Sequence, residues 1–491
     1  MIRNRLLLIL LLFCVGGNSS LLLAEPNAGN SELDAVMDGF DVDPADSGME
    51  ELLDDFADDV EAEQGAFDDA LTGFDAAEQA VESDAFDPSS SPWQLNGALI
   101  LSSSYNYTHS SPAVGKTDHR GLSRLRSALK LELKVDLINS WKGYVETRLS
   151  HDLVYQIQGR SDYTHEQLDS QESEAELGEA WVQGSLTRAV DLKLGRQLVV
   201  WGKSDNLRVT DVLNPMDQRE LGLVDIEDLR LPLTMARVDY YWSDWNLSGL
   251  TIQEIRFNKT AQPGSDFYTG QGMPIVKNTP NHSSSNLEYA MALNGLFSGW
   301  DLSLYWARIF DDQPHQELRE GAKSLEHSRL TMLGAATNVA LGNWLLKGEV
   351  GHFRGLEFTM LPGQKKQRTD TLLGVEYTGF DDTTLSLEVV DRHLHSYDSA
   401  LAAQGIKKDE WQTALRYSGE FMHARLKMTL LTLLFGTPEE GGGIARLQGD
   451  YEWTENIRLI GGIVAYHSGD KRPFTHIGDN DRLFLDVKYS F

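Results

Sequence analysis

The chain has 491 residues, of which 43 are Lys or Arg and 74 are Asp or Glu, so its formal net charge is −31 at pH 7. Its one cysteine, Cys14, lies in an N-terminal apolar run, which excludes disulfides, thiolate catalysis and cysteine-ligated metals from the remainder of the chain. No basic patch suggests nucleic acid as a partner, and no later apolar run reaches the roughly 18 residues of a transmembrane helix. A secreted soluble protein or a membrane β-barrel remains.

The N-terminus has the pattern of a secretory signal peptide. Two early arginines precede the apolar run Leu6–Val15, and Ala24 stands directly before a Glu-Pro pair. We therefore expect residues 1–24 to be a signal peptide that is cleaved after Ala24. A lipoprotein anchor at Cys14 is the alternative, but Phe13 before it is too bulky for that motif.

Residues 25–92 form an acidic segment. From Glu25 to Gly115 the chain has 22 acidic residues and no Lys or Arg, and such a block repels itself and stays solvated. We expect a largely disordered periplasmic tail with short amphipathic helices, because apolar residues recur at helical spacing in two places. These residues are Met49, Leu52, Leu53 and Phe56, followed by Phe67, Leu71 and Phe74.

This acidic tail permits three interpretations. It is a solvated linker, or its two apolar stripes dock into a basic groove on a periplasmic partner, or it buffers cations. The calcium interpretation is weak, because the segment lacks the ligand spacing of an EF-hand loop. The run Pro88–Pro92 then marks the boundary to the next domain, which we expect to span residues 93–491.

From Trp93 onward the sequence alternates between apolar and polar residues. In Arg124–Leu137 most charged residues fall on one parity and most aliphatic residues on the other, over 14 residues. Strands of soluble sandwiches usually have about 5–6 residues, whereas this length suits a tilted membrane strand. We expect the charged parity to face a lumen. The charges assigned to the lumen are Arg124, Arg126, Lys130, Glu132, Glu146, Arg148, Glu254, Arg256, Glu388 and Arg392.

The connections favour a barrel over a sandwich. Eighteen candidate strands begin near residues 93, 122, 141, 175, 189, 231, 246, 286, 300, 327, 343, 367, 383, 409, 423, 442, 457 and 482. Their links largely alternate between short turns, such as Ser298-Gly299, and long loops, such as 202–230, which is the pattern of outer-membrane barrels. We predict an all-β fold, a transmembrane antiparallel β-barrel of about 18 strands, within a range of 16 to 20.

Two further features agree with a barrel. Tryptophans lie beside the short turns, as in the aromatic girdle of a membrane interface: Trp141, Trp242, Trp245, Trp300, Trp344 and Trp453. The chain also stops after an alternating segment that ends at Phe491. This ending resembles the assembly signal of bacterial outer-membrane barrels, which implies contact with the barrel-assembly machinery, with outer-membrane lipid around the barrel and the tail in the periplasm.

The stretch Leu192–Arg230 runs from a strand into a long charged loop. Gly195 sits where the charged parity changes, which predicts a β-bulge there. The loop after Gly202 is long for a connection without function. It either folds into the barrel and narrows a pore, or lies outside as a surface loop. The residues assigned to a pore constriction are Arg196, Lys203, Arg208, Asp211, Arg219, Asp225, Asp228 and Arg230.

At this loop the chain resembles a known family. The residues Gly195-Arg196-Gln197, Trp201-Gly202, Asp211 and Asn214-Pro215 are similar to a segment of a proteobacterial porin-like barrel family, domain of unknown function 1302. The resemblance is specific over about 40 residues. It implies transport across the outer membrane, often beside RND-type inner-membrane transporters of lipids or hydrophobic molecules. An acidic tail such as the one here is unusual for the family.

An enzyme is the least favoured interpretation. The histidines are scattered singles, and although His393 and His395 share a parity, two ligands without a third make a weak metal site. We expect no cofactor and no catalytic site. The expected function is a channel or transporter barrel that passes or accepts small molecules, hydrophobic ones among the candidates, coupled to an RND-type transporter through the tail. The alternative is a non-conducting barrel that anchors or binds a periplasmic partner.

Overall fold

The computed structural model describes residues 91–112, 117–224, 227–268, 276–319, 322–359, 361, 363–436, 440–471, 474–475 and 477–491. The chain divides into two units, Met1–Pro88 and Ser89–Phe491. The predicted signal peptide and the two apolar stripes of the acidic tail lie outside the described residues. None of the described helices has the length and apolar character that a bilayer crossing requires.

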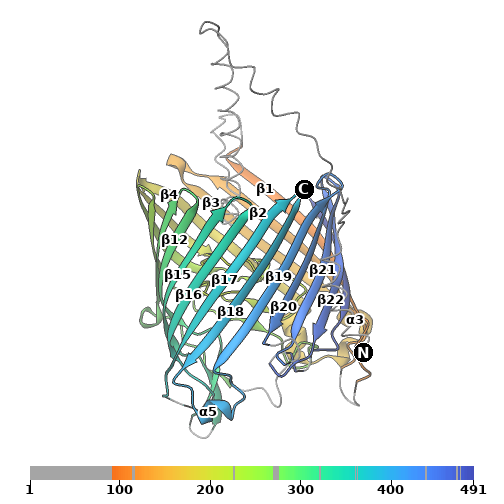
Figure 1. The fold of residues 1–491 in the computed structure, drawn as a ribbon. Coiled ribbons are helices and arrows are strands. Elements are labelled where there is room, and N and C mark those ends of the chain that lie inside the picture. The colour runs from red at the N-terminus through yellow and green to blue at the C-terminus, as the bar shows by residue number, and fades with distance from the viewer. Residues whose placement is uncertain are drawn as a thin grey trace, which may run out of the picture. The chain divides into compact units, whose positions relative to one another are not determined.

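The described residues form one closed 18-stranded sheet (Figure 1). Each strand pairs antiparallel with the next, and β1 pairs with β23 from Ala98–Ser490 to Asn106–Arg482, which closes the ring. The strands are β1 (Trp93–Asn106), β2 (Gly121–Asp136), β3 (Lys142–Asp152), β4 (Ser173–Thr187), β5 (Val190–Gln197), β7 (Leu233–Trp242), β8 (Trp245–Ile252), β11 (Glu288–Phe297), β12 (Trp300–Phe310), β15 (Arg329–Leu341), β16 (Trp344–Leu356), β17 (Lys366–Phe380), β18 (Thr383–His395), β19 (Asp409–Phe421), β20 (Leu426–Phe435), β21 (Gly443–Thr454), β22 (Ile457–His467) and β23 (Arg482–Ser490). The predicted fold class is confirmed, and every predicted strand start lies within three residues of the observed one.

The remaining elements are small, and most lie in the long links. The helices of the described residues are α3 (Val154–Gln158), α4 (His165–Gln171) and α5 (Ser399–Ala402). Single 3₁₀ turns span Ile138–Ser140, Arg160–Asp162, Glu227–Leu229 and Ser284–Asn286. Short strands pair outside the barrel sheet: β6 (Asp217–Gln218) with β9 (Lys259–Thr260), and β10 (Val276–Lys277) with β14 (Ala322–Glu326), which also pairs with β13 (His315–Arg319).

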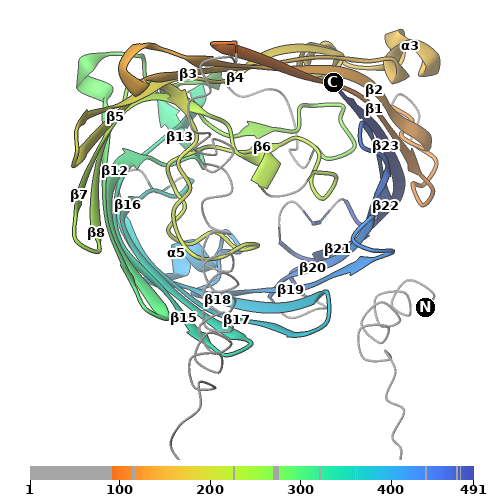
Figure 2. The same ribbon diagram turned by 90° about the horizontal axis from the view of Figure 1, so that it is seen from above.

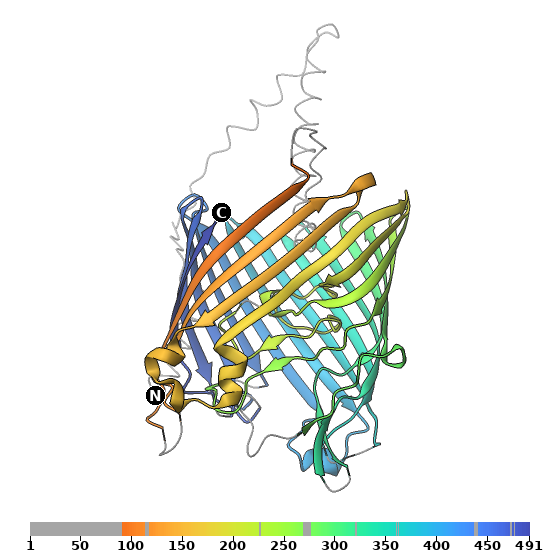
Figure 3. The ribbon, with the colours of Figure 1, turned by 180° about the vertical axis from the view of Figure 1, so that it is seen from behind.

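The two ends of the barrel differ. The C-terminus and the short turns lie at one end, the turn end, while the long links, with α3 and α5, lie at the other, the loop end (Figures 1 and 3). Two-residue turns such as 298–299 and 381–382 fit here because Gly299 and Asp382 take φ of 80° and 50°, the left-handed backbone that tight hairpins need. The six tryptophans predicted for a girdle all stand at or beside the short turns.

The outer face of the barrel is apolar. Large aliphatic side chains on one parity of the strands are exposed, among them Leu99, Leu149, Leu333 and Leu373, of which Leu373 is 71% exposed. Single exposed leucines are ordinary in soluble proteins, but a belt of them around a whole barrel is not. Such a surface is stable only against lipid, so the strands are membrane-spanning.

At Gly195 the structure differs from the prediction of a β-bulge. Strand register continues without a shift through Gly195 on both sides, opposite Trp181 and opposite Met235, so the predicted bulge is absent there. Instead of an inserted residue, the positive φ of Gly195, 126°, changes which face of the sheet the next side chains point to. As a result both Lys193, over the ring of Trp181, and Arg196 reach groups inside the barrel.

We predict that Gly195→Ala destabilises the barrel. An added Cβ would lie 2.3 Å from the carbonyl oxygen of Ala180 and 2.8 Å from Cα of Trp181, both backbone atoms, in a conformation that disfavours side chains. The expected cost is about 1–3 kcal/mol or more. Urea unfolding in detergent measures it, with Gly249→Ala as the matched control, because a Cβ there meets nothing within 4 Å. Equal midpoints for the two variants would refute the backbone constraint.

Candidate functional site

The described residues of the link between β5 and β7, 198–224 and 227–232, lie inside the barrel (Figure 2). We call it the inner loop. Of the two placements that the sequence left open, the structure shows the inward one. Part of the next long link accompanies it, because Asp217 and Gln218 of the inner loop pair in parallel with Lys259 and Thr260.

Apolar packing holds the first half of the inner loop against the wall formed by β12 and β15–β19. Trp201 stacks on Tyr305 with ring centroids 4.8 Å apart, and Leu213 joins the same cluster. Leu207 packs with Leu372 and neighbouring wall residues in a second cluster. Burial of each such side chain contributes about 1.5–3 kcal/mol to stability. The packed loop covers this wall of the barrel and keeps it from water.

The carboxylate of Glu349 on β16 anchors the loop backbone. It accepts hydrogen bonds from the backbone N–H of Lys203, from that of Ser204 at 2.7 Å, and from both the N–H and the hydroxyl of Thr210 at 3.2 and 2.9 Å. Glu349 is only 4% exposed. A buried carboxylate is costly unless it is hydrogen-bonded, and the loop supplies those bonds while the carboxylate satisfies N–H groups that have no strand partner.

Glu388 on β18 is a second anchor of the same kind. Its carboxylate is fully buried and accepts bonds from the Ser204 hydroxyl at 2.8 Å and from the N–H groups of Asp205 and Asn206 at 2.9 and 3.1 Å. The ammonium of Lys347 lies 2.5 Å from Asp205, which ties the same turn to β16. The two carboxylates therefore fix residues 203–210 mainly through backbone groups.

Charged residues of the inner loop also bind one another. Asp211 lies 3.0 Å from Nε of Arg208 and 2.9 Å from Nε of Arg230, so it joins the middle of the loop to its end. Asn214 accepts a bond from the N–H of Val199 and donates one to the carbonyl of Leu231. These contacts close the loop on itself.

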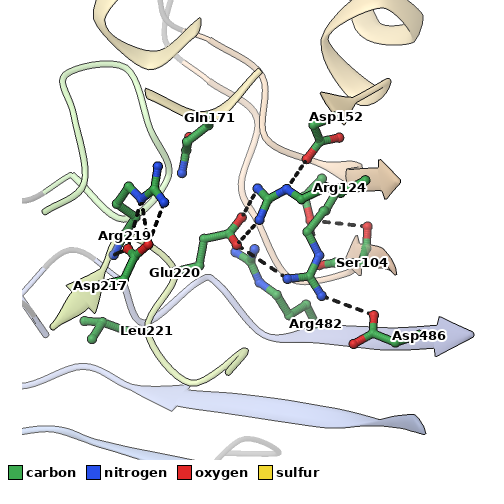
Figure 4. A network of polar contacts seen from close by, with 12 residues as sticks. Ser104, Arg124, Asp152, Gln171, Asp217, Arg219, Glu220, Leu221, Arg482 and Asp486 are labelled. Carbon is green, nitrogen blue, oxygen red and sulfur yellow. Dashed lines mark hydrogen bonds and ion pairs between the residues drawn. The ribbon is translucent and has the colours of Figure 1, made fainter. Parts of the chain in front are cut away.

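On the opposite wall, Glu220 of the inner loop meets two arginines of β2. Its carboxylate lies 3.0 Å from Arg126 and 3.4 Å from Arg124, and these arginines also contact Asp152 and Asp486 (Figure 4). Burial raises the pKa of Glu220, but the charges of Arg126 and Arg124 outweigh that effect and lower it to about 2. Glu220 therefore remains ionised at neutral pH.

A second ionic cluster lies between β4 and the loops. Glu174 pairs with Arg219 at 2.8 Å and with Lys259 at 2.6 Å. Glu176 pairs with Lys259, with Arg256 at 2.5 Å and with Arg196 at 3.5 Å, and Arg196 also reaches Glu254 at 3.0 Å. The members keep contact with solvent, since the side chain of Glu174 is 30% exposed. A cavity of about 170 Å³ lies here, between the end of the inner loop and β2–β4.

The residues assigned to a constriction lie mostly in these contacts. Arg196, Arg208, Asp211, Arg219 and Arg230 are paired as described, and Lys203 lies 3.1 Å from Asp301 of β12. Asp228 lines the 170 Å³ cavity, and Asp225 lies outside the described residues.

Most charges assigned to the lumen also lie inside the barrel. Lys130 pairs with Glu132 at 2.8 Å and with Glu146 at 3.2 Å in a cluster of its own on β2 and β3. Arg148 lines the 170 Å³ cavity. Arg392 contacts Asp370 and the carbonyl oxygen of Arg208.

Sequence reasoning missed several of the acids that matter most. Glu349, Glu174 and Glu176 sit on the interior parity of their strands, so extending the parity rule to every strand would have found them. Glu220 lies in the loop, where the sequence carries no periodicity, and nothing local marks it as the partner of Arg126.

A closed antiparallel barrel with an apolar outer face and a loop folded inside defines an outer-membrane β-barrel of the porin type. The sequence profile of the family described as proteins of unknown function, DUF1302, matches residues 79–491. The chain therefore belongs to this family. No curated protein matches the sequence.

The comparison with solved structures finds several with a similar fold, one of them a porin. A BenF-like porin from Pseudomonas fluorescens Pf-5 is 13% identical, with a TM-score of 0.51, over 81% of this chain and 98% of that chain. Pseudomonas aeruginosa OccK1 (OpdK) is 11% identical, with a TM-score of 0.49, over 81% and 98%. Acinetobacter baumannii OccAB4 is 11% identical, with a TM-score of 0.47, over 83% and 100%. At these identities the likeness to the BenF-like porin concerns the fold alone.

We predict that Glu349→Gln and Glu388→Gln each loosen the inner loop. A glutamine amide has one acceptor oxygen and turns an N–H group toward the loop's own donors, so each change costs about 1–3 kcal/mol. Hydrogen exchange of the backbone amides of residues 203–210 should accelerate. Glu132→Gln is the matched control, an inward acid that pairs with Lys130 rather than with the loop. Unchanged protection in both anchor variants would show that apolar packing alone holds the loop.

Proposed function

We propose that this protein is an outer-membrane channel whose passage runs between the inner loop and the wall formed by β2–β4. The observation that carries this proposal is the asymmetry of the interior. The loop is packed and anchored on the wall of β12 and β15–β19, while the β2–β4 side keeps charges in contact with water, such as Lys130 at 33% side-chain exposure. The long-link end would face outward and the turn end the periplasm.

The lining of this passage favours small polar solutes over hydrophobic ones. The 170 Å³ cavity is bordered by charges of both signs, including Arg126, Arg148, Glu174, Glu176 and Lys259. A hydrophobic molecule would displace water from these groups without replacing their hydrogen bonds, which is unfavourable. The mixed signs also favour weak selectivity between anions and cations.

Planar-bilayer recording of the purified folded barrel tests the channel. We expect discrete conductance steps from the natural protein with a reversal potential near zero in a salt gradient. The double variant Glu349→Gln/Glu388→Gln should give larger and noisier steps, because the loop leaves its wall. Glu326→Gln, on the β13–β14 hairpin where the side chain bonds Asn278 and Ser324, should resemble the natural protein. If folded natural protein gives no steps, the channel proposal fails and the non-conducting anchoring barrel takes its place.

The acidic tail supplies the second part of the proposal. We propose that it docks a periplasmic component of an inner-membrane transporter of the RND type, as the family resemblance suggests. The support is sequence alone, namely 22 acids without a Lys or Arg between Glu25 and Gly115, with two apolar stripes among them. Such a segment is complementary to a basic groove with apolar pockets.

Deleting residues 31–87 tests the tail. Barrel assembly and conductance should be unchanged, because the strands begin at Trp93. Crosslinking in cells followed by purification should recover a periplasmic or inner-membrane partner with the natural protein and lose it with the deletion. Recovery of the same partner from both would disprove docking by the tail.

A further inference from the structure

Three metal-ligating side chains meet at the loop end, on two different links. His315 and Glu317 belong to β13, in the link between β12 and β15, and Glu357 follows β16. Nε2 of His315 lies 3.4 Å from Oε1 of Glu317 and 3.5 Å from Oε2 of Glu357. One ligand atom from each of the three residues lies within 4.8 Å of the other two.

The imidazole at the centre of this cluster is buried. The side chain of His315 is 6% exposed and that of Glu357 is 12% exposed. Nδ1 of His315 is buried and has no hydrogen-bond partner among the described residues. Two carboxylates therefore face one imidazole, and the nearby cation, Lys365, is 3.5 Å from Glu357 but 59% exposed. Solvent screens such an exposed charge.

The distances suit a shared metal ion better than direct ion pairs. Hydrogen bonds between a charged nitrogen and a carboxylate are usually about 2.7–2.9 Å long, so 3.4 and 3.5 Å are poor contacts. Around a tetrahedral Zn²⁺, with bonds of about 2.0–2.2 Å to nitrogen and oxygen, neighbouring ligand atoms lie roughly 3.3–3.5 Å apart. The two distances from Nε2 of His315 are therefore those expected between ligands of one ion.

We propose that His315, Glu317 and Glu357 form a binding site for a divalent transition metal of the Zn²⁺ class. Nε2 and one oxygen from each carboxylate would be three ligands, with water as the fourth. The imidazole disfavours Ca²⁺, which takes oxygen ligands. The site joins the β13–β14 hairpin to the start of the 357–365 link, where the N–H of Gln316 already donates to the Thr359 hydroxyl at 3.2 Å.

Zinc titration of the full-length protein in detergent, without a histidine tag and after EDTA treatment, tests the site. One Zn²⁺ per chain should bind, and Co²⁺ in its place should give the visible absorption of a tetrahedral site. Glu357→Gln and His315→Ala should each weaken Zn²⁺ binding by more than about 100-fold, since even partners of metal ligands are worth about 10–100-fold. Zn²⁺ should also slow backbone exchange in β13 and β14 of the natural protein but not of Glu357→Gln or His315→Ala.

The control is Glu326→Gln, on the same hairpin. Glu326 pairs with Asn278 and Ser324 and is not a member of the cluster, so this variant should bind Zn²⁺ as the natural protein does. No saturable Zn²⁺ binding by folded protein, or natural affinity in Glu357→Gln, would overturn the proposal. The measurement needs no conductance, so its outcome is independent of the channel.

Discussion

The whole structure depends on the closure of one backbone hydrogen-bond ladder. Inside a bilayer no water pairs with N–H or C=O groups, and each unpaired group costs several kcal/mol. An open sheet would leave two unpaired edges, and the pairing of β1 with β23 removes both. Closure also fixes where the alternating side chains of every strand point, because one parity must face lipid and the other the interior. The exposed leucines and the interior charges are both consequences of this one constraint.

Closure creates an interior that has to be filled or hydrated, and the inner loop does this unevenly. A loop inside a barrel carries N–H groups that no neighbouring strand can pair. Glu349 and Glu388 solve that problem with carboxylates, which accept several donors at once and bind them more strongly than neutral acceptors do. The same hydrogen bonds therefore reduce both the cost of burying the two carboxylates and the cost of leaving the loop amides unpaired. Trp201 and Leu207 add apolar burial against the same wall.

The sequence predicts the barrel well because its signals are local. Alternation and turn residues act over a few neighbours, so the strand starts were correct within three residues. The contacts of the inner loop cannot be predicted from such local patterns. Its charge and length mark it as unusual, yet Glu349 lies about 140 positions from the amides it binds. Parity tells on which face a residue lies but not which loop it meets. Gly195 shows the same limit, since a parity slip has two backbone solutions, an inserted residue or a positive φ, and the sequence does not choose between them.

The two sides of the inner loop are held by forces that respond differently to solution conditions. The contacts to Glu349 and Glu388 involve backbone amides and acids that are 4% and 0% exposed, so salt screens them little. The ion pairs of Glu174 and Glu176 with Arg219 and Lys259 join side chains that are 12–30% exposed, where mobile ions weaken them. Ionic strength therefore acts on the charged side of the proposed passage and leaves the anchored side in place. In the proposed channel the passage would therefore change its width without unfolding the inner loop, because the ion pairs that salt weakens are not the contacts that hold the loop backbone.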